Sequence, residues 1–226
     1  MKKYILFFIF SISFVPTFSQ TEDLGSWMTF SFNKGLGDKF ALNLDQELRF
    51  KDNLSNFNLV YTNLGCTYKV TSFLKVSTVY RFIDKQKGDG SYGIRNRLYT
   101  NFAFKIKPKK WSLGYRLRLQ SEWRSLGYNS DLANVPEVYL RNLFKIEYTF
   151  SDRISPYIGA ELRWQLQNPR LPWGNGFDRS RFLIGSNYNI NNKMTLGTYF
   201  LYQKEWNRSD PQTLYIIGLE FGISIN

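Results

Sequence analysis

The chain has 226 residues, with 30 Lys and Arg against 18 Asp and Glu, and it contains 20 Phe, 15 Tyr and 6 Trp. This length suits one domain, and the aromatic content excludes an intrinsically disordered chain. The chain has no histidine and a single cysteine, Cys66. These counts exclude Ser-His hydrolysis, His-ligated zinc, a disulfide framework and a Cys-rich metal site. We therefore expect no enzyme, no metal and no cofactor.

The first nineteen residues have the pattern of a secretory signal peptide. Lys2 and Lys3 give a basic start, residues 4–18 form an apolar run broken at Pro16, and small residues precede Gln20. The alternative is an uncleaved membrane anchor, but the run is short for a helical span. We expect residues 1–19 to be removed and residues 20–226 to form one exported domain.

The remaining chain alternates between apolar and polar residues. In residues 111–124, for example, every second residue from Trp111 to Trp123 is mostly apolar and forms one face. The residues between them, from Arg116 to Arg124, are mostly charged and form the other face. A period of two indicates strands with one apolar and one charged face. The pattern predicts eleven segments, at about 24–33, 40–50, 57–69, 73–84, 92–107, 111–124, 137–150, 155–167, 178–190, 194–206 and 213–225.

Soluble β-sandwiches also alternate, but these segments exceed the about 5–6 residues of an ordinary strand. Trp111 and Trp123 are twelve residues apart, as are Met194 and Trp206. At about 3.3 Å per residue and a tilt of roughly 40°, twelve residues rise about 30 Å, the thickness of the hydrocarbon layer. We therefore predict an all-β fold, a transmembrane antiparallel up-and-down β-barrel. Its aromatic girdle includes Trp111, Trp123, Trp164 and Trp206.

The connections alternate between short turns and longer loops. Bacterial outer-membrane barrels keep short turns in the periplasm and longer loops outside, and they have an even number of strands. We therefore expect a monomeric barrel of ten to twelve strands in the Gram-negative cell outer membrane, with an even number favoured over the eleven segments counted. The long loops at 125–136 and 168–177 would then be extracellular, and loop 168–177 would either stack on sugars or, as we expect, pack over the barrel mouth.

The charged faces would line the lumen if the apolar faces contact lipid. Fourteen basic and seven acidic side chains have this inward parity, so we expect a strongly positive lumen. The candidate solute track is formed by Arg49, Arg81, Arg95, Arg97, Arg116, Arg118, Arg124, Arg141, Arg163, Arg181, Glu47, Glu122, Glu161 and Glu205. A carboxylate pair can cleave glycosides, but acids placed beside Arg at hairpin spacing are typical of interior salt bridges.

Two functions stay open for this lumen. The surplus of Arg would make a narrow passive pore for anionic small solutes or acidic sugars. Alternatively, Arg and Glu would fill a closed structural barrel that interacts with partners through its extracellular loops. The expected partners are outer-membrane lipid and such solutes, and no nucleic acid.

Three stretches carry a resemblance: Tyr115 to Gln120, Tyr139 to Asn142, and Pro156 to Glu161. They resemble a family of short Gram-negative outer-membrane barrels known only as a domain of unknown function. The resemblance extends from Trp27 to the end and implies an outer-membrane location without an activity, cofactor or catalytic residue. The basic interior is also similar in character to small porins for acidic oligosaccharides, which keeps the pore interpretation open.

Overall fold

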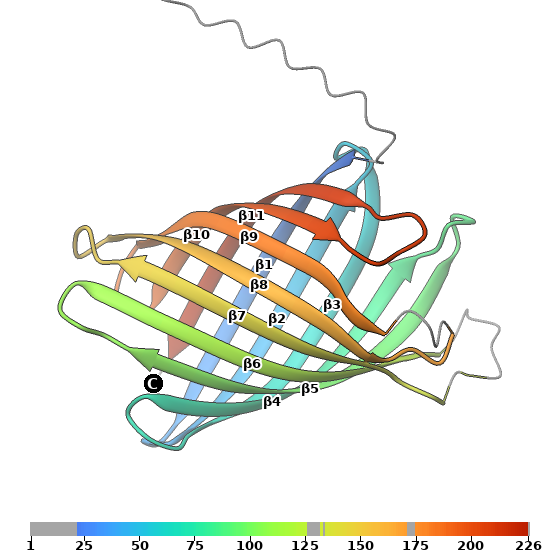
Figure 1. Cartoon of the computed structure of the whole chain (residues 1–226). Helices are drawn as coiled ribbons and strands as arrows, with labels where there is room; N and C mark the ends of the chain where they lie inside the picture. The colour runs from blue at the N-terminus through green and yellow to red at the C-terminus, as the bar shows by residue number, and fades with distance from the viewer. Residues whose placement is uncertain (1–21, 126–131, 133, 171–174, 226) are drawn as a thin grey trace, which may run out of the picture.

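The computed structural model describes residues 22–125, 132, 134–170 and 175–225, and the expected signal peptide at 1–19 lies outside them. Within these residues the chain forms eleven strands joined into one closed barrel (Figure 1). In chain order they are β1 (Glu22–Leu36), β2 (Phe40–Lys51), β3 (Asn56–Lys69), β4 (Leu74–Gln86), β5 (Tyr92–Ile106), β6 (Trp111–Arg124), β7 (Glu137–Tyr148), β8 (Ile154–Gln167), β9 (Gly176–Asn189), β10 (Met194–Glu205) and β11 (Thr213–Ile225). Among the described residues, no helix is long and apolar enough to cross a membrane.

The predicted all-β barrel is confirmed, and each predicted segment coincides with a strand. Alternation explains the result, since successive side chains of a strand point to opposite faces of the sheet. On neighbouring strands, Phe144 and Ile158 are 53% and 54% exposed on the outer surface, whereas the inward Tyr139 and Tyr157 are each 6% exposed. The barrel therefore has an apolar outer face and a polar lumen.

The eleven strands lie within the expected range of ten to twelve, but their number is odd, so the preference for an even number is wrong. β1 pairs with β11 in parallel, from Glu22 opposite Thr213 to Lys34 opposite Ile225, while β1 pairs with β2 in the antiparallel sense. A parallel ladder also satisfies the N–H and C=O groups of both edge strands, so an odd number of strands closes without an open edge. The segment at the start of the chain is therefore a full strand of the wall.

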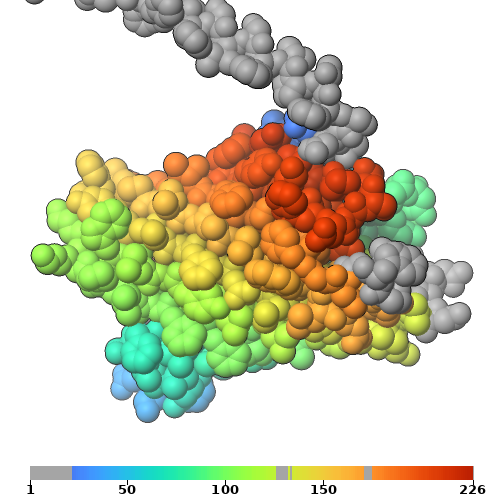
Figure 2. All heavy atoms as spheres, in the orientation of Figure 1, coloured from blue at the N-terminus to red at the C-terminus, as the bar shows by residue number. Residues whose placement is uncertain are grey.

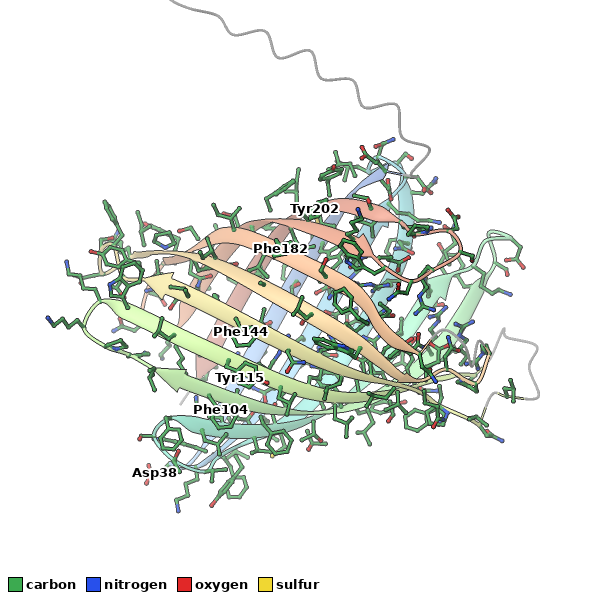
Figure 3. The ribbon with its side chains drawn as sticks, viewed as in Figure 1. Asp38, Phe104, Tyr115, Phe144, Phe182 and Tyr202 are labelled. Carbon is green, nitrogen blue, oxygen red and sulfur yellow. The ribbon has the colours of Figure 1, made fainter. Side chains whose placement is uncertain are left out.

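The outer surface carries aromatic side chains along neighbouring strands. Figure 3 shows Phe104, Tyr115, Phe144, Phe182 and Tyr202 crossing this surface from β5 to β10. The ring centroids of Tyr115 and Phe144 are 4.9 Å apart, and those of Phe104 and Tyr115 are 6.1 Å apart. In the space-filling view the side chains of these strands pack into a continuous wall (Figure 2). Such an apolar belt suits contact with lipid.

Aromatic residues also mark both ends of this belt. At one end Trp111 is 50% exposed and lies with its ring centroid 4.8 Å from that of Tyr148. At the other end Phe177 lies between Trp164 and Trp206, with centroid distances of 5.4 and 6.1 Å. The structure thus places these three predicted girdle tryptophans at the two edges, and Trp123 lies half-buried near the end of β6.

The two mouths of the barrel differ in their connections. The short-turn end holds the connections 37–39, 70–73, 107–110, 149–153 and 190–193. The long-loop end holds 87–91, 125–136, 168–175 and 206–212, together with the tight turn 52–55. In that turn Asp52, Asn53 and Leu54 all have a positive φ of 55° to 68°, which brings β2 directly into β3. Parts of loops 125–136 and 168–177 lie outside the described residues.

Candidate functional site

A cavity of about 420 Å³ occupies the middle of the lumen. Among the described residues, ten basic and four acidic side chains line it. The basic side chains are Arg49, Arg81, Arg97, Arg116, Arg118, Arg141, Lys145, Arg163, Arg179 and Arg181. The acidic ones are Asp45, Glu47, Glu161 and Glu220. Basic side chains therefore outnumber acidic ones in the cavity lining, and Arg97, Lys145, Arg163 and Arg179 pair with acids outside that lining.

Glu161 on β8 is the centre of the largest charged cluster. Its carboxylate is 5% exposed and accepts ion pairs from Arg116 at 2.8 Å, Arg141 at 2.6 Å and Arg181 at 3.1 Å. The three guanidinium groups come from β6, β7 and β9, on both sides of β8. One carboxylate thus holds three cations, so the cluster keeps two positive charges facing the lumen. The Nε of Arg116 is buried without a hydrogen-bond partner among the described residues.

The other predicted acids also hold arginines. Glu122 pairs with Arg97 and, at 3.0 Å, with Arg95. Glu47 pairs with Arg49, and Glu205 pairs with Arg179. Glu122 and Glu161 each pair with more than one arginine. Seven inward acids can therefore contact more than seven basic side chains. Sharing of this kind leaves the net charge of the lumen positive.

Two arginines bind amides in place of carboxylates. The Nε of Arg81 donates to Oδ1 of Asn63 at 2.7 Å, and the Nε of Arg118 donates to Oδ1 of Asn101 at 2.7 Å. Both arginines are 7% exposed, both line the cavity, and neither has an ion-pair partner within the described part of the chain. Because an amide brings no charge, each guanidinium keeps its full charge in the lumen.

Aromatic rings hold these guanidinium groups along the wall. The carbon centre of the Arg81 guanidinium lies 3.5 Å from the ring centroid of Tyr61, and that of Arg118 lies 4.0 Å from the centroid of Tyr99. On β1 and β2, Trp27 supports Arg49 in the same way at 3.6 Å. Cation–π contacts contribute about 0.5–2 kcal/mol each. They also fix where each positive charge lies.

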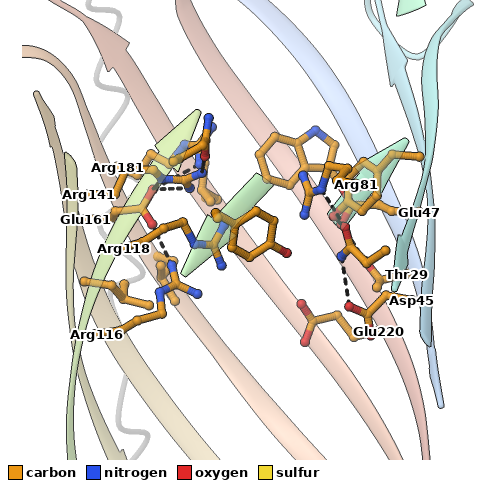
Figure 4. Close-up of a pocket in the computed structure, with 18 of the residues that line it drawn as sticks. Thr29, Asp45, Glu47, Arg81, Arg116, Arg118, Arg141, Glu161, Arg181 and Glu220 are labelled. Atoms are coloured by element: carbon orange, nitrogen blue, oxygen red, sulfur yellow. Dashed lines mark hydrogen bonds and ion pairs between the residues drawn. The ribbon is translucent and has the colours of Figure 1, made fainter. Parts of the chain in front are cut away.

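The cavity has two walls of different charge. Figure 4 shows Arg116, Arg118, Arg141 and Arg181 around Glu161 on one side, and Asp45, Glu47 and Glu220 together with Arg81 on the other. Arg49, which pairs with Glu47, belongs to this second side as well. The first wall belongs to β6–β9, and the second to β2, β4 and β11, with Thr29 of β1 donating to Glu47 at 2.8 Å. An electric field therefore crosses the cavity from one wall to the other.

A second cavity of about 610 Å³ lies at the long-loop end, against β1, β2, β4 and β11. Among the described residues, Trp27 is the side chain that lines both this cavity and the central one. Arg49 stacks on its ring, and Arg181 lies 5.4 Å from the centroid. The Trp27 indole thus stands at the boundary between the two spaces.

A family model described as "Protein of unknown function (DUF2490)" matches residues 24–214. The chain belongs to this family. Among solved structures, a NanC porin is similar to the DUF2490 chain with a TM-score of 0.50 at 12% identity, over 80% of this chain and 86% of that chain. A bacterial polysaccharide outer membrane secretin matches with a TM-score of 0.45 at 9% identity, over 84% and 77% of the two chains. No curated protein matches.

The likeness to the porin shows a shared barrel fold, and the expected membership in an uncharacterised barrel family is confirmed.

In this DUF2490 barrel, most of the candidate solute track lines the central cavity. Four of its residues, Arg95, Glu122, Arg124 and Glu205, do not line that cavity and lie near the long-loop end of their strands.

Two inward acids and a repeated motif of the lumen were not predicted from the sequence. Asp178 is 1% exposed and pairs with Arg163 and Arg208, each at 2.6 Å. A register shift between β8 and β9 turns Asp178 inward, against strict alternation. Glu137 has the inward parity and holds Arg124 at 2.7 Å and Arg170 at 3.0 Å.

The motif is Tyr-Thr-Asn, present at residues 61–63 and again at 99–101. In each copy the Tyr ring lies under an arginine of the next strand, and the Asn accepts from the same arginine. The copies are one hairpin repeat apart along the chain, and this repetition was the signal available in the sequence.

Proposed function

We propose that this protein is a narrow passive pore of the Gram-negative outer membrane that favours small anionic solutes. The observation that carries the proposal is the excess of ten basic over four acidic side chains around the central cavity. A narrow passage with one sign of charge and a low-dielectric wall concentrates counter-ions. Acidic sugars and other small anions are the solutes that such a lumen attracts.

The outer surface and the connections support this location. The apolar belt with aromatic edges supports insertion into a bilayer, and the porin-like barrel supports the outer membrane as the site. In this placement the short-turn end faces the periplasm and the long-loop end faces outward. Residues 1–19 would direct export, and the mature chain would act as a monomer without catalytic activity.

The experiment is a planar-bilayer recording on refolded residues 20–226 under a KCl gradient. We expect discrete current steps whose reversal potential indicates preference for chloride. Replacing Arg116, Arg118 and Arg141 with Ser should reduce that preference. The matched control replaces Lys109, Lys110 and Arg153 with Ser, because these exposed turn residues carry the same total charge outside the cavity.

A second function is favoured by the contacts of the loops. Arg170 of loop 168–175 pairs with Glu137, and Arg208 of loop 206–212 pairs with Asp178. These pairs fasten both loops to the barrel wall, as in a closed barrel that presents its loops to a partner. Absence of current from protein shown to be folded would overturn the pore and support this alternative.

A further inference from the structure

The central cavity contains two carboxylates that the bound arginines do not neutralise. Asp45 accepts one hydrogen bond, from Nδ2 of Asn63 at 2.9 Å, and it has no ion pair within the described residues. Glu220 is exposed to the cavity and likewise has no ion pair there. Lys145 also lines the cavity, but its Nζ pairs with Glu147 at 3.6 Å and lies 3.5 Å from the centroid of the Tyr157 ring. Among the described residues, neither carboxylate is therefore compensated by a direct ion pair in the lumen.

The opposite wall presents cations without full compensation. Arg118 is nine-tenths buried and binds the neutral Asn101, and Arg116 shares Glu161 with two other arginines. Figure 4 shows these two arginines facing Asp45 and Glu220 across the open space. In the described part of the chain, neither Arg116 nor Arg118 forms a direct ion pair with Asp45 or Glu220. The cavity thus offers an anionic contact and a cationic contact at the same time.

A solute with a single charge satisfies only one of these walls. A simple anion gains attraction from Arg116 and Arg118, but it leaves Asp45 and Glu220 without a counter-charge. A simple cation has the opposite problem and also meets the net positive lumen. A solute with an anionic group at one end and a cationic group at the other aligns its dipole with the field and contacts both walls.

We propose that the cavity selects zwitterions, with the anionic group against Arg116 and Arg118 and the cationic group against Asp45 and Glu220. This inference rests on the proposed pore and names the class of solute within it. The cavity of about 420 Å³ suits this class, because at about 30 Å³ per water it holds roughly fourteen waters, enough for an amino-acid-sized solute with part of its hydration.

The test compares three solutes of similar length as blockers of the KCl current: 4-aminobutyrate, butyrate and butylammonium. We expect 4-aminobutyrate to reach half-block at a concentration about fivefold below that of butyrate, the gain from one additional solvent-exposed ion pair. Butylammonium should be the weakest blocker. Equal block by 4-aminobutyrate and butyrate in a conducting channel would overturn the zwitterion inference and leave the pore standing.

Variants of the acidic wall test whether Asp45 and Glu220 cause the stronger block by 4-aminobutyrate. Asp45→Asn combined with Glu220→Gln should bring 4-aminobutyrate to the level of butyrate while the KCl current persists. Asp38→Asn with Asp152→Asn removes the same charge from exposed turns at the short-turn end and should leave the difference intact. Glu220→Gln alone changes a solvent-exposed side chain and should give a partial loss, which tests the inference if the double variant does not fold. Absence of current from folded wild-type protein would overturn pore and inference together.

Discussion

The guanidinium group of Arg118 lies 4.0 Å from the ring centroid of Tyr99 on the neighbouring strand, with its Nε bonded to Asn101. The Tyr99 ring is 4% exposed, so it forms a fixed surface on which the arginine rests. Arg81 repeats this arrangement on Tyr61 and Asn63, two strands away. Charge in this lumen is therefore held in place by neutral groups as well as by carboxylates.

Replacing Arg118 with Gln should reduce the preference of the pore for anions. The variant removes a charge that no described carboxylate neutralises, while loss of the cation–π contact should lower the free energy of unfolding by about 1 kcal/mol. The reversal potential in a KCl gradient and a urea unfolding curve measure the two effects. Arg163→Gln is the comparison, because Arg163 donates twice to the buried Asp178. A larger loss of selectivity in Arg163→Gln than in Arg118→Gln would contradict the assignment.

Replacing Glu161 with Gln should destabilise the barrel. The change leaves Arg116, Arg141 and Arg181 close together without their shared carboxylate, and loss of one member of a buried charged cluster costs about 3 kcal/mol. Urea unfolding of the refolded protein measures the loss. Glu205→Gln is the matched control, because Glu205 has Arg179 as its single ion-pair partner among the described residues and should cost less. Equal stability of the two variants would show that the three-arginine cluster has no special energetic role.

Replacing Gly218 with Ala should disturb the inner wall of β10 and β11. A Cβ atom at Gly218 would overlap the ring of Tyr199, which lies directly opposite on β10. Overpacking of this kind typically costs about 1–3 kcal/mol. Gly222→Ala on the same strand and face is the control, since the described atom that its Cβ would approach is the carbonyl oxygen of Thr195, at the ordinary contact distance of 3.9 Å. If Tyr199→Leu does not restore the stability of Gly218→Ala, the overlap with the ring is not the cause.

Replacing Trp27 with Ala should increase single-channel conductance. The indole lies between the central cavity and the cavity at the long-loop end, so its removal joins the two spaces. Arg49 should remain in place through its ion pair with Glu47. Trp111→Ala, which removes an indole from the outer surface, provides the control and should leave conductance unchanged. A Trp27→Ala channel with wild-type conductance would place the constriction elsewhere.

The strands and most of the lumen could be predicted because both follow from one periodicity. Arg116, Arg118 and Arg141 have the inward parity, and the structure places all three on the central cavity. Asp178 could not be predicted in this way, since a local register shift turns it inward. Side-chain parity carries no information about bulges, which depend on the pairing of neighbouring strands.

Interior salt bridges between neighbouring strands were predicted, but the sharing of Glu161 by three arginines was not. Arg116 and Glu161 lie 45 residues apart and come from strands that are not direct neighbours. Their contact depends on how the side chains reach across β7 inside the curved wall. The separation of the lumen into a basic and an acidic side likewise arises from barrel closure, which brings Glu220 of β11 and Asp45 of β2 onto one wall.

The parallel pairing of β1 with β11 gives the two ends of the wall different surroundings. Glu22 begins β1 at the mouth that holds the longer loops, and Ile225 ends β11 at the opposite mouth. In an even-stranded antiparallel barrel both ends would open into the same compartment. With the long-loop mouth outward, as proposed above, the start of β1 would face the outside of the cell and the end of β11 would face the periplasm. An epitope joined ahead of Glu22 would meet antibody added to intact cells, whereas one joined after Ile225 would stay hidden until the membrane is opened.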